Sequence, residues 1–350
     1  MKRREELTQV LGQALSSCMD GWTPQTNKNK KFEEPDYTAG IALNFTEKMN
    51  KRAADFGLKF SGCFVHQSPK CFFTNNSNNV SCEAGDLLLI CKDTTDATVK
   101  YNSVLFQLKM ADREVVTITQ VKPLRQLRLY TEWPEFSLGS NKQKKFSIEP
   151  KTPTQGAMYT FVHEKKGDDG VLSFDISAAA KIMTTTTENL ADFIVRFINF
   201  ENGRTFAEES KATDEWTKFI WELINQIKDK NFKRRNISDD DTNRYNRHNG
   251  NFLELLSIER CLYGSLTANI SGAREVSANE LEDPCIAVVF IEKGSRFNCS
   301  EESWKISDMI KKSNNKDTCD SEITIAAGVL GCKVPVSTTT QESVYWQLRN

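Results

Sequence analysis

The fold is decided by two apolar runs that a short polar segment separates. They read Asp86-Leu-Leu-Leu-Ile-Cys-Lys92 and Ser103-Val-Leu-Phe-Gln-Leu-Lys-Met110, and the segment between them contains Asp93-Thr-Thr-Asp-Ala-Thr98. Apolar runs of this length, bounded by polar residues, are typical of strands buried on both faces. The sequence therefore predicts a hairpin at the centre of a sheet.

The position of the turn fixes which residues of the hairpin face each other. A turn centred between Asp96 and Ala97 pairs residues whose numbers add up to about 193, so that Asp86 lies opposite Gln107. Side chains two apart on a strand point the same way, which places Gln107 and Lys109 on one face. We expect an acid, an amide and an amine to meet at one end of the hairpin.

Helices and strands alternate on both sides of the hairpin. Apolar side chains recur at helical spacing in residues 7–18 and again at about 37–55, where Gly57 ends the second helix. This alternation indicates an α/β fold, here a mixed β-sheet flanked by helices. The other expected strands are 60–65, 71–74, 157–163, 172–176 and 286–292, and the other expected helices are 124–130, 190–200, 215–230 and 252–261.

Charge and hydropathy indicate where in the cell the protein is expected and which partners it can bind. It carries 46 basic and 47 acidic residues, so contact with nucleic acid would need a local basic surface. No apolar run approaches the ~20 residues that span a bilayer. Glu5 and Glu6 follow the basic start, and no apolar segment of a secretory signal comes next. We therefore expect a soluble, cytoplasmic protein without a membrane partner.

The ten cysteines and the missing motifs limit the classes of enzyme and metal site that the sequence can represent. Without an export signal the cysteines are expected to be reduced and mostly buried. A zinc site at Cys63, His66, Cys71, Cys82 and Cys91 is a less favoured alternative, because the spacings are irregular. The sequence has no H-E-x-x-H, G-x-S-x-G, G-x-x-x-x-G-K-[ST] or G-x-G-x-x-G motif, which counts against metalloproteases, serine hydrolases, P-loop ATPases and Rossmann dehydrogenases.

The residues Asp86, Gln107 and Lys109 provide what phosphodiester hydrolysis requires. Oxygen ligands hold Mg²⁺, which polarises a phosphoryl oxygen and acidifies a bound water. A lysine beside the metal can stabilise developing negative charge or orient that water. The alternative interpretation is structural, with Lys109 a strand-end lysine in solvent and Asp86 a residue that closes the turn after Gly85.

At these residues the sequence resembles the PD-(D/E)XK nuclease superfamily, which has a restriction-endonuclease-like core. In that family an acid on one strand is followed, on the next strand, by an acid or glutamine, one residue and lysine. Asp86 and Gln107-Leu108-Lys109 match this pattern. The chain departs from it at Gly85, where the family has proline, and at Gln107, where an acid is commoner.

The resemblance implies a metal shell and a division of the chain. Asp86 would bind Mg²⁺ (or Mn²⁺) with help from Gln107, and Glu34, Glu47 or Glu83 would complete the shell. The expected nuclease domain is residues 36–230, preceded by an amphipathic helix and polar linker over 1–35. Residues 231–350 form a C-terminal region of mixed α/β character that can belong to the same domain.

The nucleic-acid contacts are expected after the motif. Family members often carry a glutamine on the following helix, and Gln126 fits, with Arg125 and Arg128 beside it and Tyr130 one turn away. Lys233, Arg234 and Arg235 begin a basic segment that resembles a nucleic-acid contact surface. Three aspartates at 239–241 interrupt this segment, which favours a solvated loop over a contact surface.

The expected activity is metal-dependent hydrolysis of DNA, in the setting that the resemblance implies: bacterial defence against foreign DNA. The second hypothesis is a non-catalytic binding or scaffold subunit that works with an ATPase, a helicase or a sensor. In that case the helix at 7–18 would dock onto such a partner or onto a second copy of the chain. Binding of a divalent metal at Asp86 separates the two hypotheses.

Overall fold

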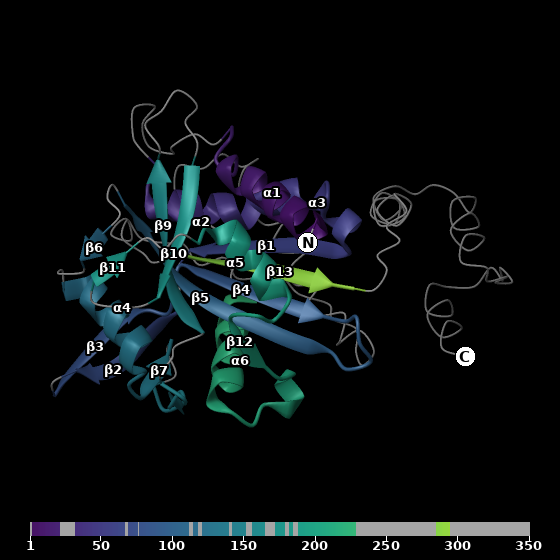
Figure 1. Cartoon of the computed structure of the whole chain (residues 1–350). Helices are drawn as coiled ribbons and strands as arrows, with labels where there is room; N and C mark the ends of the chain where they lie inside the picture. Colours follow the sequence, from purple (N-terminus) through teal and green to yellow (C-terminus); the bar gives the residue numbers. More distant parts are fainter. Residues whose placement is uncertain are drawn as a thin grey trace, which may run out of the picture. The chain divides into compact units, whose positions relative to one another are not determined.

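The computed structural model describes residues 2–21, 32–66, 69–75, 77–111, 115–117, 121–139, 142–151, 156–164, 172–178, 182–184, 188–228 and 285–294. These residues belong to a compact unit that spans Met1–Phe297 (Figure 1). A second unit, Asn298–Asn350, lies outside the described residues, as do the expected helix 252–261 and the basic segment that begins at Lys233.

Seven of the described strands form a central mixed sheet. Its order is β1-β13-β4-β5-β9-β10, and β12 pairs with β5 beside this path. The β13–β4 and β5–β9 pairs are parallel and the other pairs are antiparallel, so the expected α/β fold with a mixed sheet is confirmed. The strands are β1 (Leu58–His66), β4 (Leu87–Asp93), β5 (Lys100–Met110), β9 (Ala157–Glu164), β10 (Leu172–Ala178), β12 (Arg204–Phe206) and β13 (Cys285–Lys293).

The predicted hairpin is β4–β5, and every residue of β4 is buried. Leu87 pairs with Phe106 and Asp93 pairs with Lys100, so the register expected from the turn is confirmed. Successive residues of a strand point to opposite faces, so Leu87 and Leu88 enter two different hydrophobic cores. A strand covered on both faces explains why the run has no polar residue at alternate positions.

Helices cover one face of the sheet, over the core that contains Leu87 (Figure 1). The expected helix at 37–55 is present, but it is wound in successive α, π, α and 3-10 segments, and Gly57 ends it in the left-handed conformation (φ 70°). A Cβ on Gly62 would lie 1.6 Å from the Ala42 carbonyl oxygen, so only glycine permits this approach of helix and strand. The helices are α1 (Lys2–Ser16), α2 (Glu34–Gly40), η1 (Ile41–Phe45), α3 (Thr46–Asn50), η2 (Ala53–Phe56) and α5 (Leu190–Ile198).

The other face is covered by two helices and a small antiparallel sheet, over the core that contains Leu88 (Figure 1). Aromatic rings fill this core, and Trp133 contacts the rings of Trp216 and Phe219.

The short strands of the small sheet and of the β6–β11 pair were mostly not predicted. The elements are α4 (Val121–Glu132), α6 (Glu215–Lys228), η3 (Glu209–Lys211), β2 (Lys70–Asn75), β3 (Asn78–Glu83), β7 (Phe136–Leu138), β8 (Lys145–Phe146), β6 (Val115–Thr117) and β11 (Ile182–Thr184).

The structure does not divide at residues 35 and 230 as the sequence indicated. Leu7, Leu11 and Leu15 of α1 are buried in the same core as α5, so the N-terminal helix is part of the main unit. Strand β13 lies between β1 and β4, so the expected domain 36–230 lacks a central strand. The C-terminal region therefore contributes to the same sheet, which was the alternative left open.

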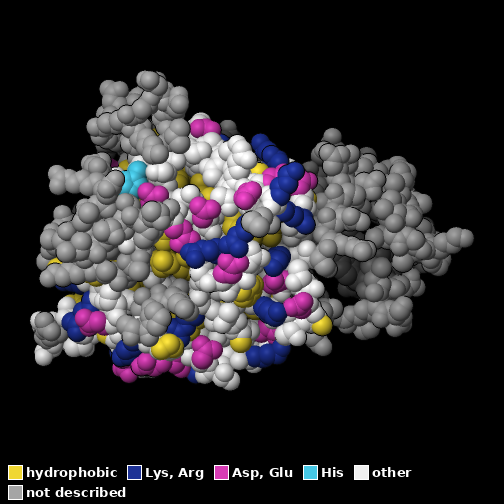
Figure 2. All heavy atoms as spheres, viewed as in Figure 1, with side chains coloured by type: hydrophobic (Ala, Val, Ile, Leu, Met, Phe, Trp, Pro, Cys, Tyr) yellow, Lys and Arg dark blue, Asp and Glu magenta, His cyan; other side chains and the backbone are white. Residues whose placement is uncertain are grey.

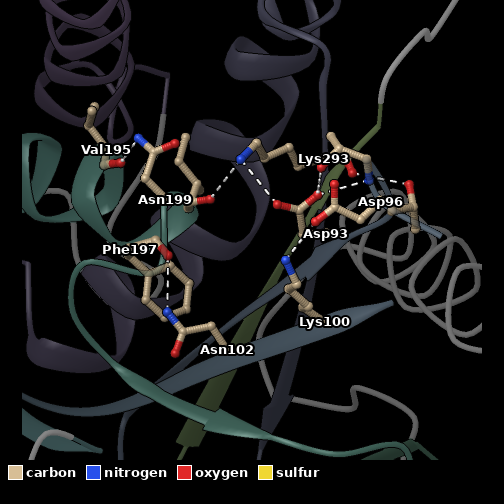
Figure 3. Close-up of polar contacts among 11 residues, drawn as sticks. Asp93, Asp96, Lys100, Asn102, Val195, Phe197, Asn199 and Lys293 are labelled. Atoms are coloured by element: carbon tan, nitrogen blue, oxygen red, sulfur yellow. Dashed lines mark hydrogen bonds and ion pairs between the residues drawn. The ribbon is translucent and has the colours of Figure 1, made fainter. Parts of the chain in front are cut away.

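The turn end of the β4–β5 hairpin is held by fully partnered polar groups (Figure 3). The Asp93 carboxylate accepts hydrogen bonds from the Thr95 backbone N–H (2.9 Å) and from Lys293 Nζ (3.1 Å). Burial raises the pKa of Asp93, but these hydrogen bonds outweigh it, so the net pKa lies below the ordinary value. Asn102 of β5 donates to the Phe197 carbonyl (3.0 Å) and so anchors the end of α5.

Among the helices of the described ranges, none combines the length and apolar character needed to cross a membrane.

Candidate functional site

The candidate site lies at the other end of the hairpin, where β4 begins and β5 ends. The Asp86 backbone N–H donates to the Phe106 carbonyl (2.8 Å), and its own carbonyl accepts from Ala287 of β13 (2.8 Å). The Asp86 Oδ2 atom accepts from the Leu108 backbone N–H at 2.7 Å. Asp86 is only 8% exposed, so the three central strands hold a buried carboxylate in a fixed position.

The environment of Asp86 opposes its negative charge. The pKa of its carboxyl is raised to about 8, because burial and the charges of Glu83 and Glu34 raise it by more than Lys109 and the Leu108 hydrogen bond lower it. Three acids and one lysine thus act on one another in this cluster. A bound cation would offset the burial and the like-charge repulsion together.

Lys109 provides the positive charge. Its Nζ atom lies 2.9 Å from Glu34 Oε2, at the first residue of α2. Burial lowers the pKa of Lys109, but Asp86, Glu34 and Glu83 raise it by more, so the net pKa lies above the ordinary value. The Lys109 side chain remains 19% exposed, and its raised pKa keeps the ammonium group charged.

Gln107 lies on β5, two residues before Lys109. Its side chain is fully buried, and neither Oε1 nor Nε2 has a hydrogen-bond partner in the part of the chain that the structure describes. Tyr159, its neighbour on β9, also has a fully buried hydroxyl without a partner. Each buried polar group left unpaired costs about 1–3 kcal/mol. Gln107, which the register places opposite Asp86, therefore has an oxygen and an amide N–H to offer to a ligand at the start of β4.

Glu83 and Gln126 form the outer edge of the cluster. Gln126 Nε2 donates to Glu83 Oε2 at 3.2 Å, and Gln126 is buried, so its amide holds an acid. Burial raises the pKa of Glu83, Lys109 lowers it, and Glu34 raises it again. On the same helix Arg128 pairs with its neighbour Glu132 (2.7 Å), whereas Arg125 is half-buried.

Glu47 is not brought to this cluster. Glu34 and Glu47 lie near opposite ends of one helical run, roughly 13 residues and so roughly 20 Å apart at 1.5 Å per residue. Asn50, just beyond Glu47, bonds to the backbone of Phe60, far from the start of β4. Of the three acids proposed to complete the metal shell, Glu34 and Glu83 meet Asp86, and Glu47 does not. Lys233, Arg234 and Arg235 lie outside the described residues.

Two groups near the site were missed in the sequence. Tyr159 pairs with Gln107 only through the parallel β5–β9 contact, which nothing local in the sequence indicates. His163 Nε2 lies 3.3 Å from Asp175 Oδ2 across β9 and β10. Lys109 pairs with Phe161, and Phe161 pairs with Asp175, so Asp175 lies about 10 Å from Lys109 across two strand spacings.

The donor atoms at this site are of the kind that Mg²⁺ prefers. No group of three or more His, Cys, Asp or Glu side chains within the described ranges is arranged to hold a metal ion. Cys63, Cys71, Cys82 and Cys91 are buried and free, as expected for reduced thiols. Magnesium, however, often takes one or two carboxylates and keeps several waters. Asp86 and the unpartnered oxygen of Gln107 fit that requirement.

Charges of both signs are interspersed among the described residues on the face shown in Figure 2. This mixture matches the near-neutral net charge of the chain. The local basic surface that nucleic-acid binding would need therefore does not stand out on that face.

Comparison with known proteins adds no relative. No family model matches the chain, and no curated protein or solved structure matches it either. The resemblance to PD-(D/E)XK nucleases thus stays a prediction from the motif, and function has to be inferred from the site itself.

Proposed function

We propose that this chain is a metal-dependent nuclease that hydrolyses DNA phosphodiester bonds. One observation carries the proposal: Asp86, Gln107 and Lys109, selected from a sequence motif, lie at one end of a buried hairpin in the expected register. Glu34 and Glu83 act electrostatically on Asp86 at the same place. Acid, amide and lysine side chains concentrated at the end of central strands are an arrangement that the core of the fold does not itself require.

The chemistry of each side chain indicates its role in the proposed reaction. Asp86 and Gln107 would hold Mg²⁺ or Mn²⁺, and this ion would polarise the phosphoryl oxygen and acidify a bound water. Lys109 would stabilise negative charge on the phosphate or orient the attacking water, because its ammonium group is charged and partly accessible. Glu34 holds Lys109 at 2.9 Å and so positions the amine. Glu83, itself fixed by Gln126, would complete the acidic side of the shell.

The test is cleavage by the purified chain of duplex DNA, single-stranded DNA and RNA, each with Mn²⁺, with Mg²⁺ and with a chelator. We expect DNA cleavage that requires the divalent ion. Asp86→Asn should lose it, while Asp93→Asn, at the other end of the same strand, should retain it as a matched control. A chain that binds Mn²⁺ but cleaves none of the three substrates, or an active Asp86→Asn variant, would contradict the proposal.

A second candidate is a non-catalytic binding or scaffold subunit, and the Lys109–Glu34 ion pair favours it. Two charges that neutralise each other at 2.9 Å can hold the site closed without a metal. Such a subunit would work with an ATPase, helicase or sensor, or as a homo-oligomer. The apolar face of α1 is already buried in the core, so that face is not available for docking. Mn²⁺ titration separates the candidates, because a retired site should bind none.

The wider setting extends the proposal. A DNA-cleaving enzyme of this type would serve bacterial defence against foreign DNA, as the resemblance implies, and would meet that DNA in the cytoplasm. Arg125 and Arg128 on α4, together with the segment at Lys233, Arg234 and Arg235, are the proposed contacts to the DNA backbone. Infection of cells with and without the chain, and with Asp86→Asn, tests this setting.

A further inference from the structure

The small sheet, whose strands β2, β3 and β7 are labelled in Figure 1, has an inner and an outer face. Cys71 and Phe73 of β2 are buried in the aromatic core, and successive residues of a strand point to opposite faces. Lys70, Phe72 and Thr74 therefore point away from the core. Lys70 and Thr74 are exposed and Phe72 is half-buried, so the outer face presents an aromatic ring.

The strand register gives the neighbours of this ring. Phe72 lies opposite Ser81 of β3 and opposite Ser137 of β7, and Ser137 lies opposite Lys145 of β8. Residues directly opposite each other on neighbouring strands share a face, so this row crosses the outer face of all four strands. Lys142, from the segment between β7 and β8, places its Nζ atom 5.0 Å from the centre of the Phe72 ring.

Lys70, Lys142 and Lys145 give the outer face positive charge. All three are exposed, and none of them forms an ion pair with an acid in the part of the chain that the structure describes. Lys144, which precedes Lys145, points to the opposite face and pairs with Glu222 of α6 at 2.5 Å. The three lysines of the outer face are thus not neutralised by the described residues as Lys144 is.

Glu83 connects the outer face with the candidate site. It lies opposite Lys70 on β3, and Gln126 holds its carboxylate at 3.2 Å. Phe72 lies two residues along β2 from Lys70, so its Cα atom is roughly 8 Å from that of Glu83. Glu135, directly before β7, is a second acid next to this face, so three lysines stand against two acids there.

An aromatic ring among lysines is suited to a single strand of nucleic acid. Bases of a single strand stack on aromatic faces whatever their sequence, and lysines pair with the phosphates. Bases in a duplex are already stacked and paired, so they do not reach the ring. An exposed contact between a lysine and a ring is weaker than base stacking, so a base can displace Lys142 from Phe72 and free its ammonium group for a phosphate.

We propose that the outer face of the small sheet, formed by Lys70, Phe72, Lys142 and Lys145, binds single-stranded DNA. One base stacks on Phe72, and the three lysines contact phosphates on either side of it. The inference rests on the proposed nuclease function and deepens it, because a strand held here passes Glu83 at the edge of the candidate site. The substrate is then single-stranded DNA or an unpaired end of a duplex.

The experiment measures binding of a fluorescent oligothymidylate to the full-length chain by anisotropy, in EDTA so that no strand is cleaved. Phe72→Leu keeps an apolar side chain but removes the ring, and it should weaken binding about fivefold to a hundredfold. Phe72→Trp keeps an aromatic face and should bind within about threefold of the unmodified chain. On an abasic strand of the same length Phe72→Leu should change affinity by less than about twofold, because no base is left to stack. Thermal melts check that each chain is folded.

The lysines are tested separately from the ring. Lys142→Ala and Lys145→Ala should each reduce the slope of log affinity against log salt by about 0.7, the value for one phosphate contact on a single strand. Lys144→Ala is the matched control from the same segment, and it should leave affinity and slope unchanged because its side chain pairs with Glu222 on the other face. These positions are exposed, so this test holds even if Phe72→Leu does not fold.

The outcomes separate the inference from the proposed function. A chain that binds the strand through Phe72 but cleaves no DNA would reject the nuclease and retain the binding face. An active nuclease whose affinity for the strand is unchanged by Phe72→Leu would overturn the inference and leave the candidate site standing. Equal losses on thymidine and abasic strands would overturn it too, as would binding of duplex DNA or oligouridylate more than about tenfold tighter. Equal salt slopes for Lys142→Ala, Lys145→Ala and Lys144→Ala would remove the phosphate contacts.

Discussion

An aspartate lies at each end of strand β4, and the surroundings of the two carboxyl groups shift their pKa values in opposite directions. Asp93, at the turn, accepts hydrogen bonds from Thr95 and Lys293, which lower its pKa (Figure 3). Asp86 accepts from the Leu108 backbone N–H and hydrogen-bonds to Glu83, but burial and the charges of Glu83 and Glu34 raise its pKa to about 8. A partnered buried acid stabilises a fold, whereas an acid kept unfavourable by its surroundings is typical of a functional site.

The largest effect is expected from substitution of Asp86. Asp86→Ala should lower Mn²⁺-dependent cleavage by about a thousandfold or more, because it removes a direct metal ligand. The melting temperature should fall by only a few degrees, because the main loss to the fold is the hydrogen bond from the Leu108 backbone N–H. Cleavage rates and thermal melts of the same samples give both numbers. Undiminished cleavage by a folded variant would show that the site lies elsewhere.

Lys109 should show the next largest effect. Lys109→Ala is expected to lower turnover about a hundredfold with little change in DNA affinity, because the proposed amine acts on the transition state. Single-turnover kinetics and binding of DNA in Ca²⁺ separate the two quantities. If affinity and turnover fell together, Lys109 would be a contact to the DNA backbone or a structural residue.

At the other end of the strand the effect should be on stability. Asp93→Asn should cost about 1–2 kcal/mol of unfolding free energy at pH 7 and leave cleavage unchanged. The folded-state pKa of Asp93 is lowered, so its contribution is complete above the unfolded pKa of about 4 and is lost as the pH falls through the folded pKa. Urea unfolding at pH 7, 5 and 3 should therefore show a difference between the two chains that shrinks at pH 3. A constant difference would mean that packing, and not charge, is lost.

The smallest effects are expected from substitutions of Gln107. Gln107→Glu should tighten Mg²⁺ binding by up to about tenfold, because hard cations favour charged oxygen ligands, and activity should persist or fall moderately. Gln107→Leu should keep the fold and weaken Mg²⁺ binding. Calorimetric titration with thermal melts distinguishes these results. A destabilised Gln107→Glu variant with unchanged metal affinity would indicate a structural glutamine that faces away from the metal.

The hairpin and its register could be predicted because they depend on neighbours in the sequence. The polar turn fixes the pairing of Leu87 with Phe106, and that pairing alone places Asp86 opposite Gln107. Contacts between distant segments could not be predicted in this way. Tyr159 reaches Gln107 by a parallel pairing. Glu47 was named because the resemblance implies an acid from the helix before the sheet, and no sequence signal indicates where along the sheet a helix residue lies.

The small strands show the same limit on prediction. Strands β7 and β8 have three and two residues, too few for an alternating pattern to emerge. The close contact at Gly85 was not predicted either. In the sequence it is only a departure from the proline of the family pattern, and the structure shows that it lies close to Tyr130.

The position of β13 has a consequence for synthesis of the protein. Strand β4 is complete at residue 93, whereas the strand that separates it from β1 begins at residue 285. A ribosome that adds about 5–20 residues per second needs roughly 10–40 s to cover that interval. During this time the growing chain presents two apolar strands whose shared neighbour has not yet been made, which invites pairing with other chains. Chaperones that act on nascent chains should therefore bind this protein for long periods, and a stop codon between residues 93 and 285 should yield an insoluble product.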